Sequence, residues 1–182
     1  MYRTARLVLR GWREEDLDPF AALCADVDVM EFFPSTLSAD ESEAMVNRIS
    51  QRMNDDGFGL WAIEVDGAFA GFTGLNSAAS IEGTSFTPCV EVGWRLAKWA
   101  WGKGYASEAA RESLRIGFEE HQLHSIFSWT TQSNARSESV MRHIGMARRP
   151  DLDFDHPNTP NWWGQPHIVY SLERSAWAEY GM

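Results

Sequence analysis

Two glycines with a lysine between them stand where an apolar alternation changes into a helical pattern. Residues 90–96 alternate apolar and polar side chains, which is typical of a β-strand. From 106 to 118 the apolar residues recur at helical spacing. The glycines in Gly102-Lys103-Gly104 allow a sharp turn and a close approach of a ligand. Free N–H groups of the helix's first turn, at the positive end of its dipole, would then face outward. The sequence therefore predicts an anion site suited to a phosphate or pyrophosphate.

The glycine spacing differs from that of two common nucleotide-binding loops. A Walker loop needs G-x-x-x-x-G-K-[ST], and a dinucleotide loop needs a third glycine that does not follow Gly104. A plain strand-to-helix turn is the simplest alternative for an isolated G-x-G. A second segment argues for more than a turn. It runs from Asn134, a good helix cap, to a stop at Gly145 and ends at Met146.

Together the two segments resemble the GNAT superfamily of acyl-CoA N-acetyltransferases. The family's loop pattern is Q/R-x-x-G-x-G/A, and residues 99–104 match both glycines, with Trp99 in place of Gln or Arg. Residues 105–109 are similar to the helix start of the ribosomal-protein N-terminal acetyltransferase (RimJ/RimL-like) branch. Residues 134–146 resemble the family's N-x-x-S-x-x-V-x-x-x-x-G-F. The resemblance covers nearly the whole chain and is best over residues 90–146.

The resemblance implies an enzyme that transfers an acetyl group from acetyl-CoA to a primary amine by direct attack in a ternary complex. The acceptor would be a protein or peptide N-terminus or a small-molecule amine. Backbone amides of the glycine loop would bind the pyrophosphate, and Asn134 would bind the pantetheine arm. A strand amide near Trp94 or Leu96 would donate to the thioester oxygen. The residues expected to bind acetyl-CoA are Trp94, Leu96, Trp101, Gly102, Lys103, Gly104, Tyr105, Ala106, Ser107 and Asn134.

The attacking amine must be neutral, so a base or a water path to a base is required. Glu91 is the first candidate, because it lies in the strand before the glycine loop and alternates away from the neighbouring valines. Glu64, in an earlier strand, is the second candidate. The alternative for each is a solvated or ion-paired strand residue. Many family members protonate the leaving thiolate with a tyrosine. Met141 stands at that place here, and the resemblance assigns this role to Ser137 instead.

Aromatic side chains in two other segments are candidates for the acceptor pocket. Phe32 and Phe33 lie in the first helical region, and Trp162 and Trp163 follow a loop rich in proline and asparagine. Such a long loop is either functional or poorly ordered. The alternative to an acceptor pocket is a small apolar cluster that pins this loop.

Two departures from the family pattern leave a second function open. Trp99 and Met141 are compatible with an acyl-CoA-binding sensor or interaction domain of the same fold that is catalytically weak or inactive. A metal site is not expected. His121 and His124 are three residues apart, but no cysteine or carboxylate cluster completes a ligand set.

The composition limits the classes of partner. The formal net charge of −10 disfavours nucleic acid, which needs a basic face, and would attract a cationic acceptor. No apolar run reaches the ~20 residues of a membrane span, and no signal peptide is expected at the N-terminus. The two cysteines indicate a reducing cytoplasm rather than a disulfide framework. The 182 residues are expected to form one N-acetyltransferase domain, 1–182, as a monomer or homodimer.

The remaining patterns predict the elements that position these residues. Asp66-Gly67 is a hairpin turn signal, and Ser38 with Glu41 forms a capping box. Strands are expected over 5–10, 60–65, 68–75, 90–96, 125–131, 147–154 and 167–172, and helices over 14–24, 26–34, 39–55, 105–121 and 134–144, with a short helix at the end. This order predicts an α+β protein. The resemblance implies the GNAT fold, a central mixed, mostly antiparallel twisted sheet of about seven strands flanked by about four helices.

Overall fold

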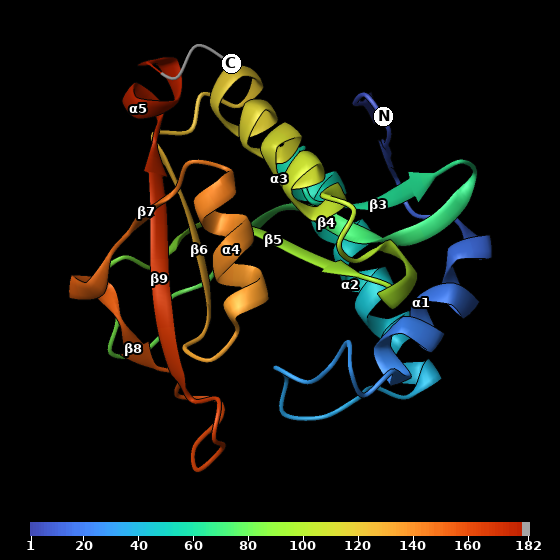
Figure 1. Ribbon diagram of the computed structural model, residues 1–182, viewed down its shortest axis with the longest axis horizontal. Helices are drawn as coiled ribbons and strands as arrows, with labels where there is room; N and C mark the ends of the chain where they lie inside the picture. The colour runs from blue at the N-terminus through green and yellow to red at the C-terminus, as the bar shows by residue number, and fades with distance from the viewer. Residues whose placement is uncertain (180–182) are drawn as a thin grey trace.

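A twisted sheet of nine strands runs through the molecule, as shown by the computed structural model, which describes residues 1–179 (Figure 1). The strands are β1 (Tyr2–Arg3), β2 (Val8–Arg10), β3 (Leu60–Val65), β4 (Ala68–Ala78), β5 (Cys89–Leu96), β6 (Ser125–Thr131), β7 (Ala147–Arg148), β8 (Phe154–Asp155) and β9 (Pro166–Glu173). The α-helices are α1 (Leu17–Ala25), α2 (Ala39–Asp56), α3 (Tyr105–Arg115), α4 (Ala135–His143) and α5 (Arg174–Glu179). No helix within residues 1–179 is long and apolar enough to cross a membrane.

The sheet is mixed and mostly antiparallel, as predicted. Its order is β1-β2-β3-β4-β5-β6-β9-β7, and β8 pairs with β9 off this path. Only the β5–β6 pair is parallel among the described strands, and its register contains the single pair Glu91 and Phe127. The described residues form nine strands and five α-helices instead of about seven and four. Two-residue strands and the short terminal helix account for the difference.

Helices cover both faces of the sheet. On one face, α1 and α2 bury side chains against β4 in a cluster that contains Phe20, Leu23, Cys24, Val29, Val46 and Phe72. On the other face, α3 and α4 pack on β5 in a larger cluster that includes Val92, Leu96, Ala109, Leu114 and Met141. Because side chains alternate along β5, Val92 and Leu96 point to α3 and α4. Arg95 points to the opposite face and contacts Cys24.

The strongest local signals are confirmed. The Ser38 hydroxyl accepts from the Glu41 N–H at 3.2 Å, and the Ser38 N–H donates to the Glu41 carboxylate at 2.8 Å. This capping box opens α2, and Gly57, with a φ of 75°, ends it. The expected turn at Asp66-Gly67 joins β3 and β4. These elements follow from hydrogen bonds between neighbouring residues, so the sequence alone predicts them.

The expected helix over 26–34 is wrong. This segment forms successive turns instead. The Asp26 carboxylate accepts from the N–H of Asp28 at 2.9 Å, and the Leu37 N–H donates to the Cys24 carbonyl at 3.0 Å. An aspartate that bonds the backbone two residues later favours a turn over a helix.

Three expected strands differ from the observed ones by more than one residue at an end. The first begins at Val8 rather than at residue 5, and the strand expected over 68–75 continues to Ala78, because it pairs with β5 as far as Cys89. The strand expected over 147–154 is interrupted by a helical turn at Pro150–Leu152. An ion pair between Arg148 and Asp153 closes this turn.

Candidate active site

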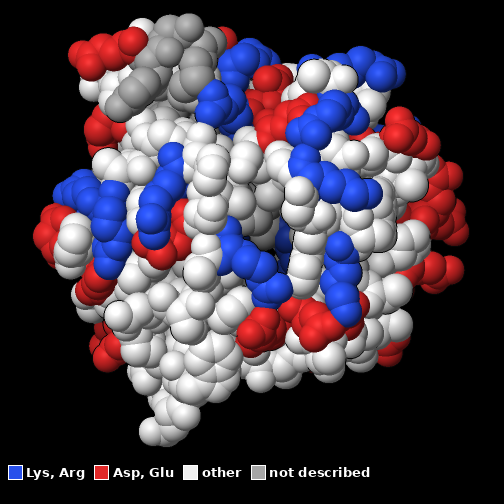
Figure 2. Space-filling model, viewed as in Figure 1, with Lys and Arg blue, Asp and Glu red and all other residues white. Residues whose placement is uncertain are grey.

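A cavity of about 970 Å³ opens where β5 and β6 separate. After the pair Glu91 and Phe127 the two strands diverge, whereas β5 stays paired with β4 along its whole length. Figure 1 shows β5 and β6 in different parts of the sheet, with α3 and α4 in front of the gap. In Figure 2 the same face is hollowed near its centre, and Lys and Arg side chains border the hollow.

The separation leaves backbone groups of β5 turned toward the cavity. The Gly93 carbonyl points to β4, since it accepts from the Thr73 hydroxyl at 3.1 Å. The Val92 carbonyl points the other way and accepts from the Ser128 hydroxyl at 2.9 Å. The Leu96 carbonyl also points away from β4 and accepts from the Trp101 indole at 2.8 Å. Alternate residues of an antiparallel ladder face the same side, so the Trp94 amide points toward the gap as well.

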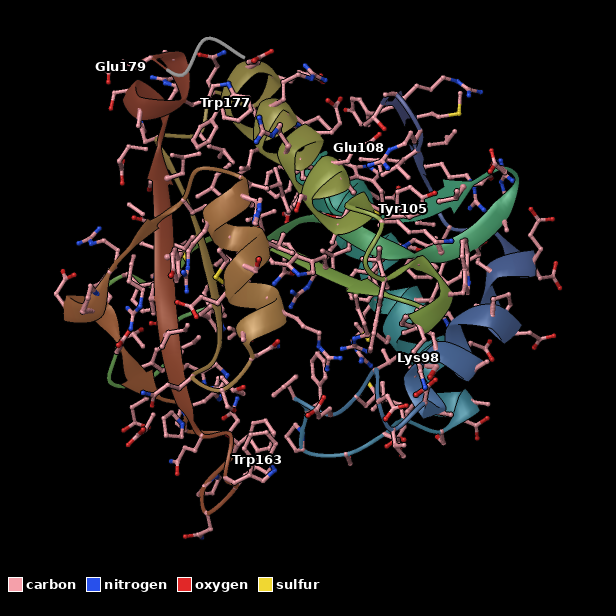
Figure 3. All side chains as sticks on the ribbon, viewed as in Figure 1. Lys98, Tyr105, Glu108, Trp163, Trp177 and Glu179 are labelled. Carbon is pink, nitrogen blue, oxygen red and sulfur yellow. The ribbon has the colours of Figure 1, made fainter. Side chains whose placement is uncertain are left out.

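The glycine turn opens α3 at one end of this cavity. Gly102 and Gly104 have φ values of 70° and 78°, which favour glycine, and α3 begins at Tyr105 (Figure 3). No side chain caps the helix, so the amides of its first turn keep their hydrogen-bonding capacity. The space around Gly102 is open, with no atom within 4 Å of the position of an added Cβ. The turn therefore presents an accessible row of amides at the place where the sequence predicts an anion site.

Arg6 holds this turn from the N-terminal segment. Its guanidinium donates to the Lys103 carbonyl at 2.8 Å and pairs with Glu108 at 2.6 Å. The Arg6 N–H also donates to Glu108 at 2.9 Å. In Figure 3, Tyr105 and Glu108 lie at the N-terminal end of α3. The Lys103 carbonyl is therefore fixed away from the row of amides, and the side chain of Lys103 is not part of the cavity lining.

Glu91 is a carboxyl group in the cavity, next to Asn76 on the paired strand. Burial raises the pKa of Glu91 to about 8, and a hydrogen bond from Asn76 opposes part of this rise. A carboxyl group with this pKa changes its protonation state near neutral pH. It is thus suited to accept a proton from an amine.

Asn134 and Ser137 border the cavity at the start of α4. The Asn134 side-chain oxygen accepts from the Ser137 N–H at 3.1 Å, and its amide nitrogen donates to the Thr130 hydroxyl at 3.0 Å. Asn134 is thus the helix cap expected from the sequence, and this bond fixes where Ser137 lies. Met141, at the place of the family's tyrosine, is 1% exposed.

Two loops meet at the edge of the cavity. Phe32 and Phe33 come from the α1–α2 connection, and Trp162 comes from the loop between β8 and β9; all three line the cavity. Trp163 does not line it but packs on Phe32, with 6.0 Å between ring centroids. Figure 3 shows Trp163 in the loop that projects from this edge. The aromatic residues therefore form a contact between the loops and also part of the cavity wall.

Most of the predicted site residues gather in this one cavity. Those that line it are Phe32, Phe33, Glu91, Trp94, Leu96, Trp101, Gly102, Gly104, Tyr105, Ala106, Ser107, Asn134, Ser137 and Trp162. The structure does not bring Lys103, Trp163 or Glu64 into the lining. Glu64 instead forms ion pairs with Arg10 at 2.7 Å and with Arg13 at 3.4 Å.

The lining residues that are absent from the sequence-based prediction include Arg95, Arg136, His156 and His167. The sequence could have indicated Arg95, because side chains alternate along β5 and this places Arg95 on the same face of the strand as Glu91. The other three come from separate segments, and no local pattern connects them. Burial lowers the pKa of both His156 and His167. Within residues 1–179 no three His, Cys, Asp or Glu side chains are grouped so that they could hold a metal ion.

The sequence of this chain matches the family model of the acetyltransferase (GNAT) domain over residues 6–147. The chain is also 30% identical over 179 residues to the FsC-acetyl coenzyme A-N(2)-transacetylase of Aspergillus fumigatus, an alignment that covers 96% of this chain and 76% of that protein.

Solved structures share the fold. An acetyltransferase of the GNAT family from Bacillus anthracis superposes with a TM-score of 0.77 at 25% identity and covers 95% of this chain and 98% of its own. RimL, a ribosomal L7/L12 alpha-N-protein acetyltransferase in complex with coenzyme A, gives a TM-score of 0.75 at 15% identity, over 95% of this chain and 97% of its own. At that identity the likeness to RimL shows the fold alone. The family model, the A. fumigatus relative and the shared architecture agree, and the chain belongs to the GNAT family of acetyl-CoA-dependent N-acetyltransferases.

Proposed function

We propose that this enzyme acetylates a primary amine by direct attack on acetyl-CoA inside the cavity beside β5. One observation carries the proposal: a single cavity connects the free amides that open α3 with the half-buried carboxyl group of Glu91. The first can bind the pyrophosphate of the donor, and the second can remove a proton from the acceptor. The exposed backbone of β5 lies between them.

The remaining roles follow from position. Amides between Gly102 and Ser107 bind the pyrophosphate. Asn134 binds the pantetheine arm through the second N–H of its side-chain amide, because the first donates to Thr130 and the side-chain oxygen caps α4. The Trp94 N–H, turned toward the cavity, donates to the thioester oxygen as negative charge develops there. Phe32, Phe33 and Trp162 surround the acceptor, and Trp163 supports them through Phe32.

The chemical step is a thioester aminolysis. The amine nitrogen bonds to the acetyl carbonyl carbon, and the carbon–sulfur bond breaks. The amine proton passes to the Glu91 carboxylate, directly or through water, and the leaving thiolate receives a proton from the Ser137 hydroxyl. Ser137 suits this role because it lines the cavity and its hydroxyl makes no hydrogen bond within residues 1–179. Glu91 is favoured over Glu64 as the base, since Glu64 is held by two arginines.

We also propose a branch of the family, a location and an oligomeric state for this protein. Membership of the RimJ/RimL-like branch rests on the helix start over residues 105–109, and it would make a peptide N-terminus the acceptor. A location in the cytoplasm rests on the content of two cysteines. A monomer or a homodimer is equally compatible with the fold.

Thiol release from acetyl-CoA with a panel of peptides and small amines tests the activity. We expect turnover with at least one amine, and Ser137→Ala should lower kcat about 10- to 100-fold without changing the affinity for acetyl-CoA. Ser133→Ala is the matched control, because Ser133 is exposed and lies outside the cavity lining. A catalytically inactive acyl-CoA-binding domain would instead bind acetyl-CoA and release no thiol above background with any amine.

A further inference from the structure

Arg95 is a cavity residue whose charge lacks a counterion. Its guanidinium donates to the Cys24 sulfur at 3.3 Å and lies over the Phe33 ring, 4.1 Å from the centroid. The Phe72 ring centroid is 5.5 Å away. The Arg95 Nε is buried and has no hydrogen-bond partner within residues 1–179. Neither a thiol nor an aromatic ring neutralises this cation.

Arg10 shows by contrast how a buried arginine of this protein is paired. Arg10 is 4% exposed, and it pairs with Asp16 at 2.6 Å and with Glu64 at 2.7 Å. No carboxylate of residues 1–179 lies within the 4.0 Å of an ion pair from Arg95. A buried charge is costly unless it is paired and hydrogen-bonded. Arg95 is therefore a buried donor without a carboxylate partner, at the wall of an open cavity.

The position of Arg95 separates it from the pyrophosphate site. Arg95 packs with Cys24 and Phe72 on the α1 face of the sheet, whereas α3 packs on the opposite face of β5. In the proposed function, the amides that open α3 already bind the phosphates of the donor. The anion that would pair with the Arg95 guanidinium must therefore belong to the acceptor.

Glu91 and Arg95 share one face of β5. They are four residues apart, which corresponds to about 13 Å along a strand. Gly93 stands between them, and no atom lies within 4 Å of the position of an added Cβ there. The floor of the cavity thus carries a proton acceptor, an open space and a cation in one line.

Resting on the acetyl transfer proposed above, we propose that the acceptor is an amine that also carries a carboxylate, and that Arg95 binds this carboxylate. A guanidinium binds a carboxylate through two parallel hydrogen bonds. The rings of Phe33 and Phe72 exclude water from the pair and strengthen it. The second arginine of the lining, Arg136, is already paired with Glu31 at 2.5 Å, so it is not an equivalent site. Arg95 thereby orients a zwitterionic acceptor with its amine toward Glu91.

Matched acceptor pairs test this specificity. The panel contains α- and ω-amino acids and the corresponding amides, which keep the amine and lose the charge. For the preferred acceptor, kcat/KM of the wild-type enzyme should exceed that of its amide at least tenfold. Arg95→Gln should lower kcat/KM much more for the acid than for the amide, so that the preference for the acid disappears. Arg149→Gln is the control, because Arg149 pairs with Asp151 outside the cavity lining and its loss should preserve the preference.

A wild-type enzyme that acetylates both members of every pair equally well overturns the inference and leaves the proposed function intact. The inference is also overturned if Arg95→Gln lowers kcat/KM equally for the acid and the amide while the affinity for acetyl-CoA is unchanged. Arg95 would then be a packing residue. An enzyme that acetylates no amine at all removes the proposed function and this inference together. If Arg95→Gln does not fold, inhibition of the wild-type enzyme by carboxylates that lack the amine tests the proposal instead. Carboxylates without the amine should compete with the acceptor and not with acetyl-CoA, and the absence of such inhibition contradicts the proposal.

Discussion

Glu91 combines the two properties that a catalytic base of this reaction needs. It lies in the cavity that the substrates must share, and burial raises its pKa to about 8. Below that pH the carboxyl group is largely protonated and cannot accept a proton. Above it, the carboxylate is available. The activity should therefore depend on the ionisation of this single residue in an accessible pH range.

For the wild-type enzyme we expect kcat to rise with pH and to level off above about 8. Glu91→Gln should lower kcat about 100-fold or more and should remove this rise. A pH series from 6 to 10 with saturating substrates, for both proteins with the same acceptor, makes the measurement. An acceptor amine that titrates in this range affects both proteins alike, so the difference between the profiles belongs to Glu91.

Other titratable groups at the cavity do not reproduce this behaviour. Burial lowers the pKa of His156 and His167, so both imidazoles lose their protons below the range in which Glu91 titrates. His143 lies at the far end of α4, in a hydrogen bond with the Ser139 carbonyl. A rise near pH 8 that persists in Glu91→Gln would contradict the assignment of the base.

The residues of β5 also show how far the sequence could go. Alternation places Glu91 away from Val92, and this was enough to nominate it. The same alternation places Arg95 beside Glu91, but a strand arginine is usually solvated or paired. Only the positions of Cys24, Phe33 and Phe72, which come from other segments, reveal that Arg95 is neither solvated nor paired with a carboxylate.

The turn into α3 is the element that we propose binds the donor. Its two glycines adopt left-handed φ values, and Arg6 fixes the carbonyl between them. This conformation exposes the first amides of the helix to the cavity. A side chain at Gly104 would strain the backbone, and its Cβ would come within 3.4 Å of the Arg6 guanidinium.

Gly104→Val should therefore weaken acetyl-CoA binding at least tenfold and destabilise the fold by about 1–2 kcal/mol. Calorimetric titration and urea unfolding measure the two effects. Gly67→Val is a matched control, because Gly67 also has a left-handed φ, of 83°, but lies in the β3–β4 turn outside the cavity lining. Its stability should fall similarly while its affinity stays that of the wild type. Unchanged affinity in a folded Gly104→Val would move the donor site away from α3.

The α1–α2 connection shows why one element was not predicted. The pattern over 26–34 resembled a short helix before a proline, but turns around Asp26 replace it. These turns place Phe33 over Arg95 and Phe32 against Trp163. The conformation of the segment depends on its tertiary contacts, so neither propensity nor periodicity could supply it.

At the scale of the whole molecule, the sheet is divided at the gap between β5 and β6. One half contains β1 to β5, and the other contains β6, β7, β8 and β9. Besides the pair of Glu91 and Phe127 and the hydrogen bond from Ser128 to the Val92 carbonyl, the halves meet through helices and loops, including the Glu31–Arg136 ion pair. A donor bound in the gap would contact both halves and would stabilise the folded state.

Acetyl-CoA at 100 times its Kd should therefore stabilise the protein by about 2.7 kcal/mol. For a chain of this length that corresponds to an increase in Tm of roughly 5–10 °C. Thermal unfolding with and without the ligand makes the measurement. The increase should fall to about half or less for Gly104→Val at the same ligand concentration and should persist in Gly67→Val. A wild-type Tm that does not respond to acetyl-CoA would show that the gap is not the donor site.

The sequence by itself determined the parts of this protein that depend on neighbours along the chain. The capping box at Ser38, the glycine turn, the alternation in β5 and the cap at Asn134 all arise from contacts within a few residues. Local hydrogen bonds and periodicity therefore sufficed to predict most of the order of elements and the glycine turn that opens α3.

The tertiary structure decided what depends on residues far apart in the sequence. It separated Glu91, which lies in the cavity, from Glu64, which is held by Arg10. It also left Arg95 beside Cys24, 71 positions away, without a carboxylate among the described residues. The pKa of a base and the pairing of a charge are set by the packing of distant segments, and no local pattern encodes which segments will meet.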